Sequence, residues 1–179
     1  MKKLLFATAF SLGFVTANAQ TETATVSSER NNDIMISPIE LIAAPLLNVS
    51  YERLLNEDSG VGLNAMFFLE GDEDYKFSQF SPYYRMYFGK KYASGFFVEG
   101  FVPITSSTDS YTTSYYDDNG YREETHTEKG TTAGIGIGFG AKWVAKKNII
   151  FEASMGVARR FGNSDDITGK GMLGIGYRF

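Results

Sequence analysis

The stretch TTAGIGIGFGAKW, residues 131–143, alternates glycine with large apolar residues. Every second residue from Gly134 to Gly140 is glycine, and the residues between them are Ile135, Ile137 and Phe139. Successive side chains of a strand point to opposite faces, so this stretch predicts a strand with one bare face and one apolar face. Glycine weakens a strand because it packs nothing and loses backbone entropy. Four glycines on one face therefore indicate that the space beside that face is needed for something else.

The same two-residue period recurs along the chain from about residue 33. We predict eight strands, over residues 33–42, 47–55, 61–69, 80–88, 96–104, 131–143, 149–161 and 173–179. We find no convincing amphipathic helix, and the connections carry turn residues such as the NEDSG of residues 56–60. An even number of antiparallel strands joined by turns predicts an all-β, eight-stranded antiparallel up-and-down barrel, because closure removes exposed edges.

The placement of charge predicts which face points inward. Nearly all mid-strand charges share the glycine face, whereas the apolar face carries only Arg53 and Arg159, near strand ends. A transmembrane β-barrel has an apolar exterior and a polar interior, and long basic side chains at its ends can reach the headgroups. We therefore predict a transmembrane barrel, and not a lipocalin-type barrel. Its interior should hold a paired charge network, because an isolated buried charge is very costly. The predicted network consists of Glu52, Arg85, Glu99, Lys142, Glu152 and, near one end, Arg178.

The glycine face has a packing explanation. An eight-stranded barrel is only just wide enough for its side chains to fill. We expect the glycines at 134–140, 156, 174 and 176 to form a thin wall, with the space beside it filled by large side chains from the opposite wall. The predicted filling residues are Phe68, Tyr83, Tyr87, Phe97 and Phe101. The alternative is that the glycines line a small cavity or pore.

The N-terminus predicts export. A basic start, an apolar run from Leu4 to Val15 and the small residues Ala17 and Ala19 are typical of a secretory signal peptide over residues 1–19. We expect a flexible lead-in over residues 20–32 and the barrel over residues 33–179. The chain has no Cys, a single His and a net charge of −4, which exclude disulfides and argue against nucleic-acid binding. We expect no cofactor and no metal.

The eight strands, the signal peptide and the terminal GIGYRF resemble the small bacterial outer-membrane barrels, the OmpA membrane domain and OmpX. The ending ANAQ of the predicted signal resembles signal peptides of the Bacteroidota. The resemblance implies a monomer in the outer membrane of a Gram-negative bacterium, in contact with outer-membrane lipid. It also implies recognition by the barrel-assembly machinery through an alternating apolar signal. The residues that match this signal are Leu173, Ile175, Tyr177 and Phe179.

The longest predicted outer connection covers residues 105–130. Asn119-Gly120 suits a type I′ turn, so we predict that the flanking strands continue past the membrane as a hairpin. The alternative is a disordered loop rich in Ser and Thr. Tyrosine favours interfaces, and the hairpin carries Tyr111, Tyr115, Tyr116 and Tyr121. Its edges could pair with a strand of a surface or host protein.

The sequence thus predicts a non-enzymatic outer-membrane barrel with a structural or adhesive role, acting through this hairpin. The alternatives are a small-solute pore, a lipid-binding barrel and, least favoured, a lipid A-modifying enzyme that uses His126 as a base. A Gly136-x-Gly138-x-x-Ala141 run fits a dinucleotide fingerprint superficially, but no helix is expected after it. Acidic residues from Glu70 to Asp74 lack the spacing of an EF-hand.

Overall fold

The computed structural model describes residues 30–69, 75–117, 120–162 and 167–179. The predicted signal peptide lies outside these residues, as does most of the predicted lead-in, although Asn32 already belongs to the first strand. The elements are β1 (Asn32–Ile36), α1 (Pro38–Ala43), β2 (Leu46–Leu54), β3 (Ser59–Phe68), β4 (Tyr75–Tyr87), β5 (Gly95–Phe101), β6 (Ile104–Asp117), β7 (Gly120–Val144), the short 3-10 helix η1 (Lys146–Asn148), β8 (Ile149–Phe161) and β9 (Ile167–Arg178).

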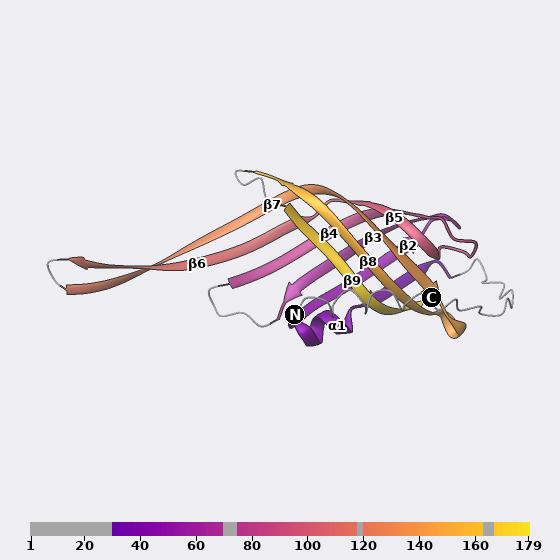
Figure 1. The fold of residues 1–179 in the computed structure, drawn as a ribbon, viewed down its shortest axis with the longest axis horizontal. Helices are drawn as coiled ribbons and strands as arrows, with labels where there is room; N and C mark the ends of the chain where they lie inside the picture. The colour runs from indigo at the N-terminus through magenta and orange to yellow at the C-terminus, as the bar shows by residue number, and fades with distance from the viewer. Residues whose placement is uncertain (1–29, 70–74, 118–119, 163–166) are drawn as a thin grey trace, which may run out of the picture.

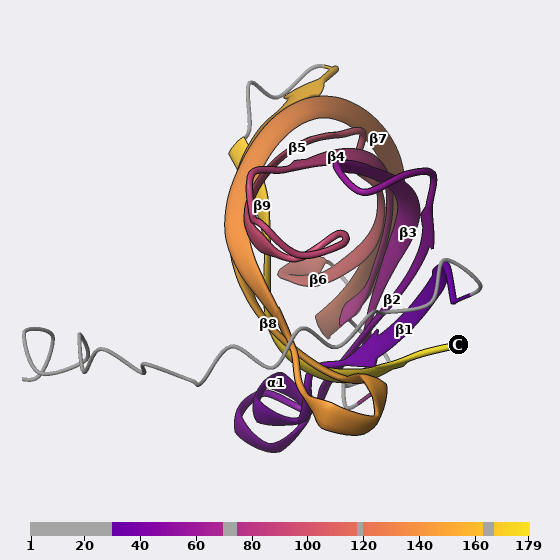
Figure 2. The same cartoon turned by 90° about the vertical axis from the view of Figure 1, so that its right-hand side faces the viewer.

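The strands form a closed antiparallel barrel (Figures 1 and 2). Each strand pairs with the next along the chain, except that β5 and β6 both pair with β4 on one side and β7 on the other. β1 pairs with β9 to close the ring. At the closure, the backbone N–H of Asn32 donates to the carbonyl of Phe179 at 3.0 Å, and the N–H of Phe179 donates back at 2.8 Å. We call this the terminal end of the barrel. The predicted all-β up-and-down architecture is confirmed.

β5 and β6 follow one another along the same line and together form one of the eight strand positions in the barrel wall, each of which we call a stave. The register of β5 against β7 pairs Phe101 with Gly136, and that of β6 against β7 pairs Ile104 with Ala133. The register is therefore continuous from β5 to β6, without a bulge. The interruption falls at Val102 and Pro103, where proline cannot donate to the ladder. The carbonyl of Pro103 still accepts from the N–H of Gly134 at 2.9 Å, so the wall continues across the break.

Beyond the barrel, β6 and β7 continue together as a two-stranded projection (Figure 1). Their pairing extends from Ile104 opposite Ala133 to Asp117 opposite Gly120. We call residues 110–117 of β6 and 120–132 of β7 the ribbon. The predicted hairpin is confirmed in its backbone pairing, while residues 118 and 119 of its turn lie outside the described chain.

The two faces of the wall divide as the sequence predicts. Exposed apolar side chains cover the outside of every stave, and charged and polar side chains face inward with almost no exposure. Along β7, for example, Ile135 is 61% exposed and Ile137 is 70% exposed, while Lys142 is fully buried. Among the described residues, no helix is long and apolar enough to cross a membrane.

The predicted first strand over residues 33–42 is wrong in its second half. β1 ends at Ile36, and Pro38 begins the six-residue helix α1. Proline has no N–H for a sheet ladder, but it is accommodated in the first turn of a helix, where that N–H has no intrahelical partner. The expectation that the chain contains no helix is corrected to the same extent. α1 packs against β2 and β9, so it occupies the place where β1 would otherwise continue.

The glycines of β7 make room for aromatic rings, but the rings come from the neighbouring strand and not from the opposite wall. A Cβ at Gly136 would lie 2.6 Å from the ring of Phe101, and one at Gly140 would lie 2.7 Å from the ring of Phe97. Both aromatic residues belong to β5, where they sit directly opposite these glycines in the pairing register. Phe68 does not take part, because it is 40% exposed at the end of β3 and packs edge-on against Phe77.

We predict that Gly136→Val destabilises the barrel by about 1–3 kcal/mol, the usual cost of overpacking a filled interior. Its added atoms would collide with the Phe101 ring and the Cβ of Ala158. Gly100→Ala is the matched control on the adjacent stave, since a Cβ there meets nothing within 4 Å. Urea unfolding of the barrel in detergent measures both variants. Equal stability of Gly136→Val and the parent would contradict the packing explanation.

Candidate functional site

Arg85 on β4 lies at the centre of the interior and contacts three carboxylates. Its Nη1 is 3.0 Å from Glu52 Oε2 and 2.8 Å from Glu152 Oε2, and its Nη2 is 2.8 Å from Glu99 Oε2. The guanidinium also lies 3.8 Å from the centroid of the Phe97 ring. A planar guanidinium offers five donors in fixed directions, which allows it to serve several carboxylates from neighbouring staves at once.

Lys142 and Arg178 extend the network to the terminal end. Lys142 Nζ lies 2.6 Å from Glu52 Oε2 and 3.0 Å from Asp33 Oδ2. Asp33 in turn accepts from Arg178 Nε at 2.7 Å and from its Nη2 at 2.9 Å. Arg178 also donates to the backbone carbonyls of Tyr92 and Ala93 at 3.0 and 2.9 Å. The turn between β4 and β5 therefore folds across the terminal end and is held there by the last strand.

Two members of the network were missed by the sequence reasoning. Asp33 joins Lys142 to Arg178, and Lys170 on β9 lies 2.8 Å from Glu99 Oε1. Lys170 also lies over the rings of Tyr83 and Phe101, at 4.4 and 4.7 Å from their centroids. A signal for Lys170 was available, because its even number places it on the same face of the strand as Arg178. Asp33 was harder to find, because it is the first residue of the weak alternating pattern over residues 33–42.

All six charges predicted to face inward are buried, and with the two additional residues the network is electrically balanced. Four cations meet four carboxylates in contacts of 2.6–3.9 Å. The cations are Arg85, Lys142, Lys170 and Arg178, and the carboxylates are Asp33, Glu52, Glu99 and Glu152. Equal numbers matter because an unpaired charge in such an interior is far more costly than a paired one.

The interior toward the ribbon contains a group of uncharged polar side chains. Thr105 and Thr168 donate to Gln79 Oε1 at 3.0 and 3.1 Å, which joins β4, β6 and β9 across the barrel. Deeper in, Asn64 Nδ2 donates to Asn48 Oδ1 at 2.6 Å. These amide and hydroxyl contacts hold the staves together without adding net charge.

Side chains also bind carbonyls along the open edge of β9, which has no pairing with β1 beyond Ile36. In an antiparallel strand the N–H and C=O of one residue point toward the same neighbour, so Gly169, Gly171 and Leu173 turn their carbonyls toward the gap. These carbonyls accept from the side chains of Gln79 at 3.4 Å, Asn48 at 2.7 Å and Ser37 at 3.3 Å, respectively. Asn48 also donates to Glu40 of α1 at 2.5 Å, so α1 is tied to the gap that it covers.

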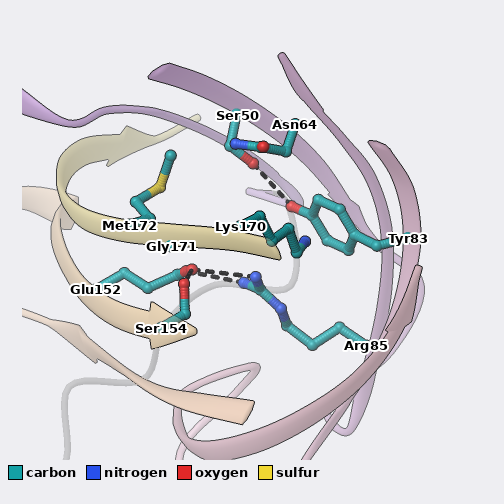
Figure 3. Close-up of a pocket in the computed structure, with 9 residues that line it drawn as sticks. All are labelled: Ser50, Asn64, Tyr83, Arg85, Glu152, Ser154, Lys170, Gly171 and Met172. Atoms are coloured by element: carbon teal, nitrogen blue, oxygen red, sulfur yellow. Dashed lines mark hydrogen bonds and ion pairs between the residues drawn. The ribbon is translucent and has the colours of Figure 1, made fainter. Parts of the chain in front are cut away.

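A small polar cavity remains inside the barrel, next to Arg85, Glu152 and Lys170 of the charge network (Figure 3). Its volume is about 10 Å³, and it is lined by Ser50, Asn64, Tyr83, Arg85, Glu152, Ser154, Lys170, Gly171 and Met172. A single water molecule needs about 10–15 Å³. The cavity is therefore too small for a solute, and the space predicted as a possible pore is occupied by side chains.

The ribbon residues that the sequence singled out are described only in part. The side chains of Tyr111, Tyr115 and Tyr116 lie outside the described set, as does Asn119. Gly120 has a φ of +117°, a conformation that favours glycine at a turn. The hydroxyl of Tyr121 donates to Glu123 Oε1 on the same strand at 2.6 Å, and its oxygen lies 3.0 Å from Ser114 Oγ on β6.

The predicted assembly-signal residues lie on the outside of the barrel. Leu173, Ile175, Tyr177 and Phe179 are each 41–51% exposed. Trp143 and Phe151, which face each other on β7 and β8, are also exposed at this end, at 55% and 47%. The terminal end is therefore ringed by aromatic side chains.

The sequence offered His126 and the acidic stretch 70–74 as candidates for catalytic and metal chemistry. His126 is exposed on the ribbon, with Nε2 3.9 Å from Glu124 Oε2. The described part of the chain holds no cluster of three or more His, Cys, Asp or Glu residues suited to a metal ion. The acidic stretch 70–74 lies outside it.

Fold and interior together define a closed eight-stranded β-barrel with a filled, charge-balanced core. Residues 15–167 match the family described as "Protein of unknown function (DUF3575)". The chain therefore belongs to this family. No curated protein matches it in sequence.

Two solved structures resemble the chain. One is the crystal structure of the N-terminal β-barrel domain of OprF from Pseudomonas aeruginosa, with a TM-score of 0.49 at 17% identity, covering 84% of this chain and 96% of that one. The other is the backbone structure of the Yersinia pestis outer membrane protein Ail in a phospholipid bilayer nanodisc, with a TM-score of 0.43 at 17% identity, covering 84% of this chain and 100% of that one. At this identity the likeness concerns the fold alone.

We predict that Arg85→Ala costs about 3–5 kcal/mol of unfolding free energy, because it leaves buried carboxylates without their partner. Glu99→Ala should destabilise by a similar mechanism, since it leaves Arg85 and Lys170 short of one counter-charge. Lys91→Ala, an exposed residue in the turn after β4, is the control and should change little. Denaturant unfolding in detergent micelles provides the comparison. Unchanged stability of both interior variants would show that the network contributes nothing.

Proposed function

We propose that the protein is a non-enzymatic β-barrel of a Gram-negative outer membrane, which anchors the ribbon outside the cell as a binding surface for another protein. The observation that carries the proposal is the ribbon itself. A membrane needs only about 9–11 residues per strand, whereas β7 has 25 residues and is paired along its length. The excess length is explained by neither a bilayer nor the closed interior.

The exterior of the barrel supports a membrane location. Exposed Ile, Leu, Val, Phe and Met side chains cover the outside of the staves, and several exposed aromatic residues lie around the terminal end. Apolar outward faces bounded by aromatic girdles are characteristic of barrels that span a bilayer. The short connections lie at the terminal end, which we assign to the periplasm, and the ribbon lies at the opposite, outer end.

The ribbon has the properties of a pairing surface. Beyond Asp109, β6 has β7 as its only strand partner within the described residues, so its other edge offers free backbone donors and acceptors. Residues 110–116 of that edge, SYTTSYY, are rich in strand-favouring Thr and Tyr and carry no charge. Exposed edges of this kind are templates for strand addition by another chain.

The ribbon can be shortened without disturbing its register. Deleting residues 110–115 together with 122–127 removes six facing pairs and keeps both faces and the turn. We expect this variant to assemble normally, because the barrel pairings are untouched. A photo-crosslinker at the exposed Thr113 of the full-length chain, in intact cells, should yield a defined protein adduct that is missing from a lipid-facing control at Val157.

If the Thr113 adduct does not form, or if every surface phenotype survives the deletion, the ribbon has no binding role. Normal assembly of the shortened variant is required for this interpretation. It is checked by the shift in electrophoretic mobility that a folded barrel shows on heating.

The competing function is a small-solute pore, and conductance separates the two. We expect the purified protein to insert into planar bilayers without stable ion-conducting steps, because buried ion pairs and aromatic rings fill its interior. Regular conductance steps, present with this protein and absent with detergent alone, would favour the pore. Recovery of the chain as a soluble periplasmic protein would refute both functions.

A further inference from the structure

We propose that the outside of the barrel at the terminal end carries a binding site for the phosphate of an anionic phospholipid, formed by Arg30 and Arg53. The inference rests on the proposed function for the orientation of the barrel, which puts this end in the inner leaflet of the membrane. It concerns a different surface and a different ligand from the ribbon.

The two arginines lie close to the seam where the barrel closes. Arg53 stands on the outer face of β2 opposite Asn32, and its Nη1 donates to Asn31 Oδ1 at 2.5 Å and to Asn32 Oδ1 at 2.9 Å. Arg30 precedes β1, and its Nη1 donates to the hydroxyl of Tyr177 on β9 at 3.3 Å. Both side chains are therefore held on the outer surface by contacts to β1 and β9.

Neutral oxygens alone hold these guanidinium groups within the described chain. Neither arginine has a carboxylate within 4 Å there, in contrast to Arg85, Lys142, Lys170 and Arg178 of the interior network, each of which has one. Each guanidinium has five donors, and the contacts above use only some of them. Both arginines are exposed, so an anion can reach the remaining donors.

The chemical groups on the outer surface beside the arginines follow the same order as the parts of a phospholipid. Ile34 pairs with Tyr51 on one side and with Tyr177 on the other, so two tyrosines flank one isoleucine on the outer wall. The hydroxyl of Tyr51 donates to Asn32 at 2.8 Å, on the side of the arginines. Ile34 and Ile36, which are 53% and 38% exposed, continue the surface away from the rim. Cations, hydroxyl groups and apolar side chains thus follow one another as phosphate, glycerol and acyl chain do.

Charge selects the class of lipid. Two guanidinium groups that have no carboxylate partner among the described residues favour a headgroup with net negative charge over a zwitterionic one, because the site then approaches neutrality. Arginine also suits phosphate better than lysine does, since its planar fork can bind two oxygens together. Phosphatidylglycerol is the probe with this chemistry.

Native mass spectrometry of the full-length protein released from detergent micelles tests the site. We expect phosphatidylglycerol to be retained in preference to phosphatidylcholine. The variant R30Q/R53Q should bind it at least about tenfold more weakly, the effect of losing charge-assisted hydrogen bonds. The matched control is K90Q/K91Q, which removes the same charge from an exposed turn at the same end and should stay within about twofold of the parent.

Equal weakening by both double variants would show general attraction to a basic rim and overturn the defined site. Equal retention of the two lipids, or displacement of phosphatidylglycerol by millimolar inorganic phosphate, would overturn the lipid assignment. A parent protein that shifts on heating but retains no phosphatidylglycerol refutes this inference alone. A parent protein that does not insert into bilayers refutes the proposed function instead.

Discussion

The structure depends on the neutralisation of charge inside a narrow barrel. Four buried cations and four buried carboxylates from β1, β2, β4, β5, β7, β8 and β9 form one connected network, with Arg85 contacting three of the acids. None of these seven strands can shift along its neighbours without separating some of these partners. The network therefore fixes the pairing register from inside, in addition to the backbone ladder. The network also explains why the barrel has no open channel along its axis, since the same side chains fill its centre.

Packing around this network explains the unequal walls. Bare glycines on β7 lie opposite Phe97 and Phe101 on β5, and the Phe97 ring lies against the guanidinium of Arg85. The rings separate the central charges from the wall and add cation–π attraction. Glycine on β7 is thus the condition for an aromatic residue on β5, which in turn helps to hold the central arginine. The local cost of glycine in a strand is offset by the packing that it allows across the ladder.

The closure of the barrel is its least regular part. β1 has only five residues, because Pro38 ends the ladder and starts α1. Three carbonyls on the freed edge of β9 then accept hydrogen bonds from Ser37, Asn48 and Gln79, while Arg178 and Asp33 connect the two strands in the other half of the seam. In the bilayer that we propose as its surroundings, unsatisfied backbone groups would be costly, so these side chains replace a missing strand. The phospholipid site that we propose lies on the outside of this same seam.

The amino-acid sequence by itself determined the strand period, the closed all-β architecture and the separation of charged from apolar faces. These follow from the alternation of side chains, which is a local property of each strand. It also placed six of the eight network residues inside, since parity alone decides their face. Only the tertiary structure decided which charges pair, that Asp33 and Lys170 complete the balance, that Phe68 stays outside, and that β5 fills the space beside β7. Those outcomes depend on the register between strands far apart in the sequence, and a two-residue period carries no information about register. The tertiary structure also decided that residues 38–43 form a helix and not the second half of a strand. A proline predicts a break in the hydrogen-bond ladder, but it does not predict which side chains bind the backbone groups left open by that break.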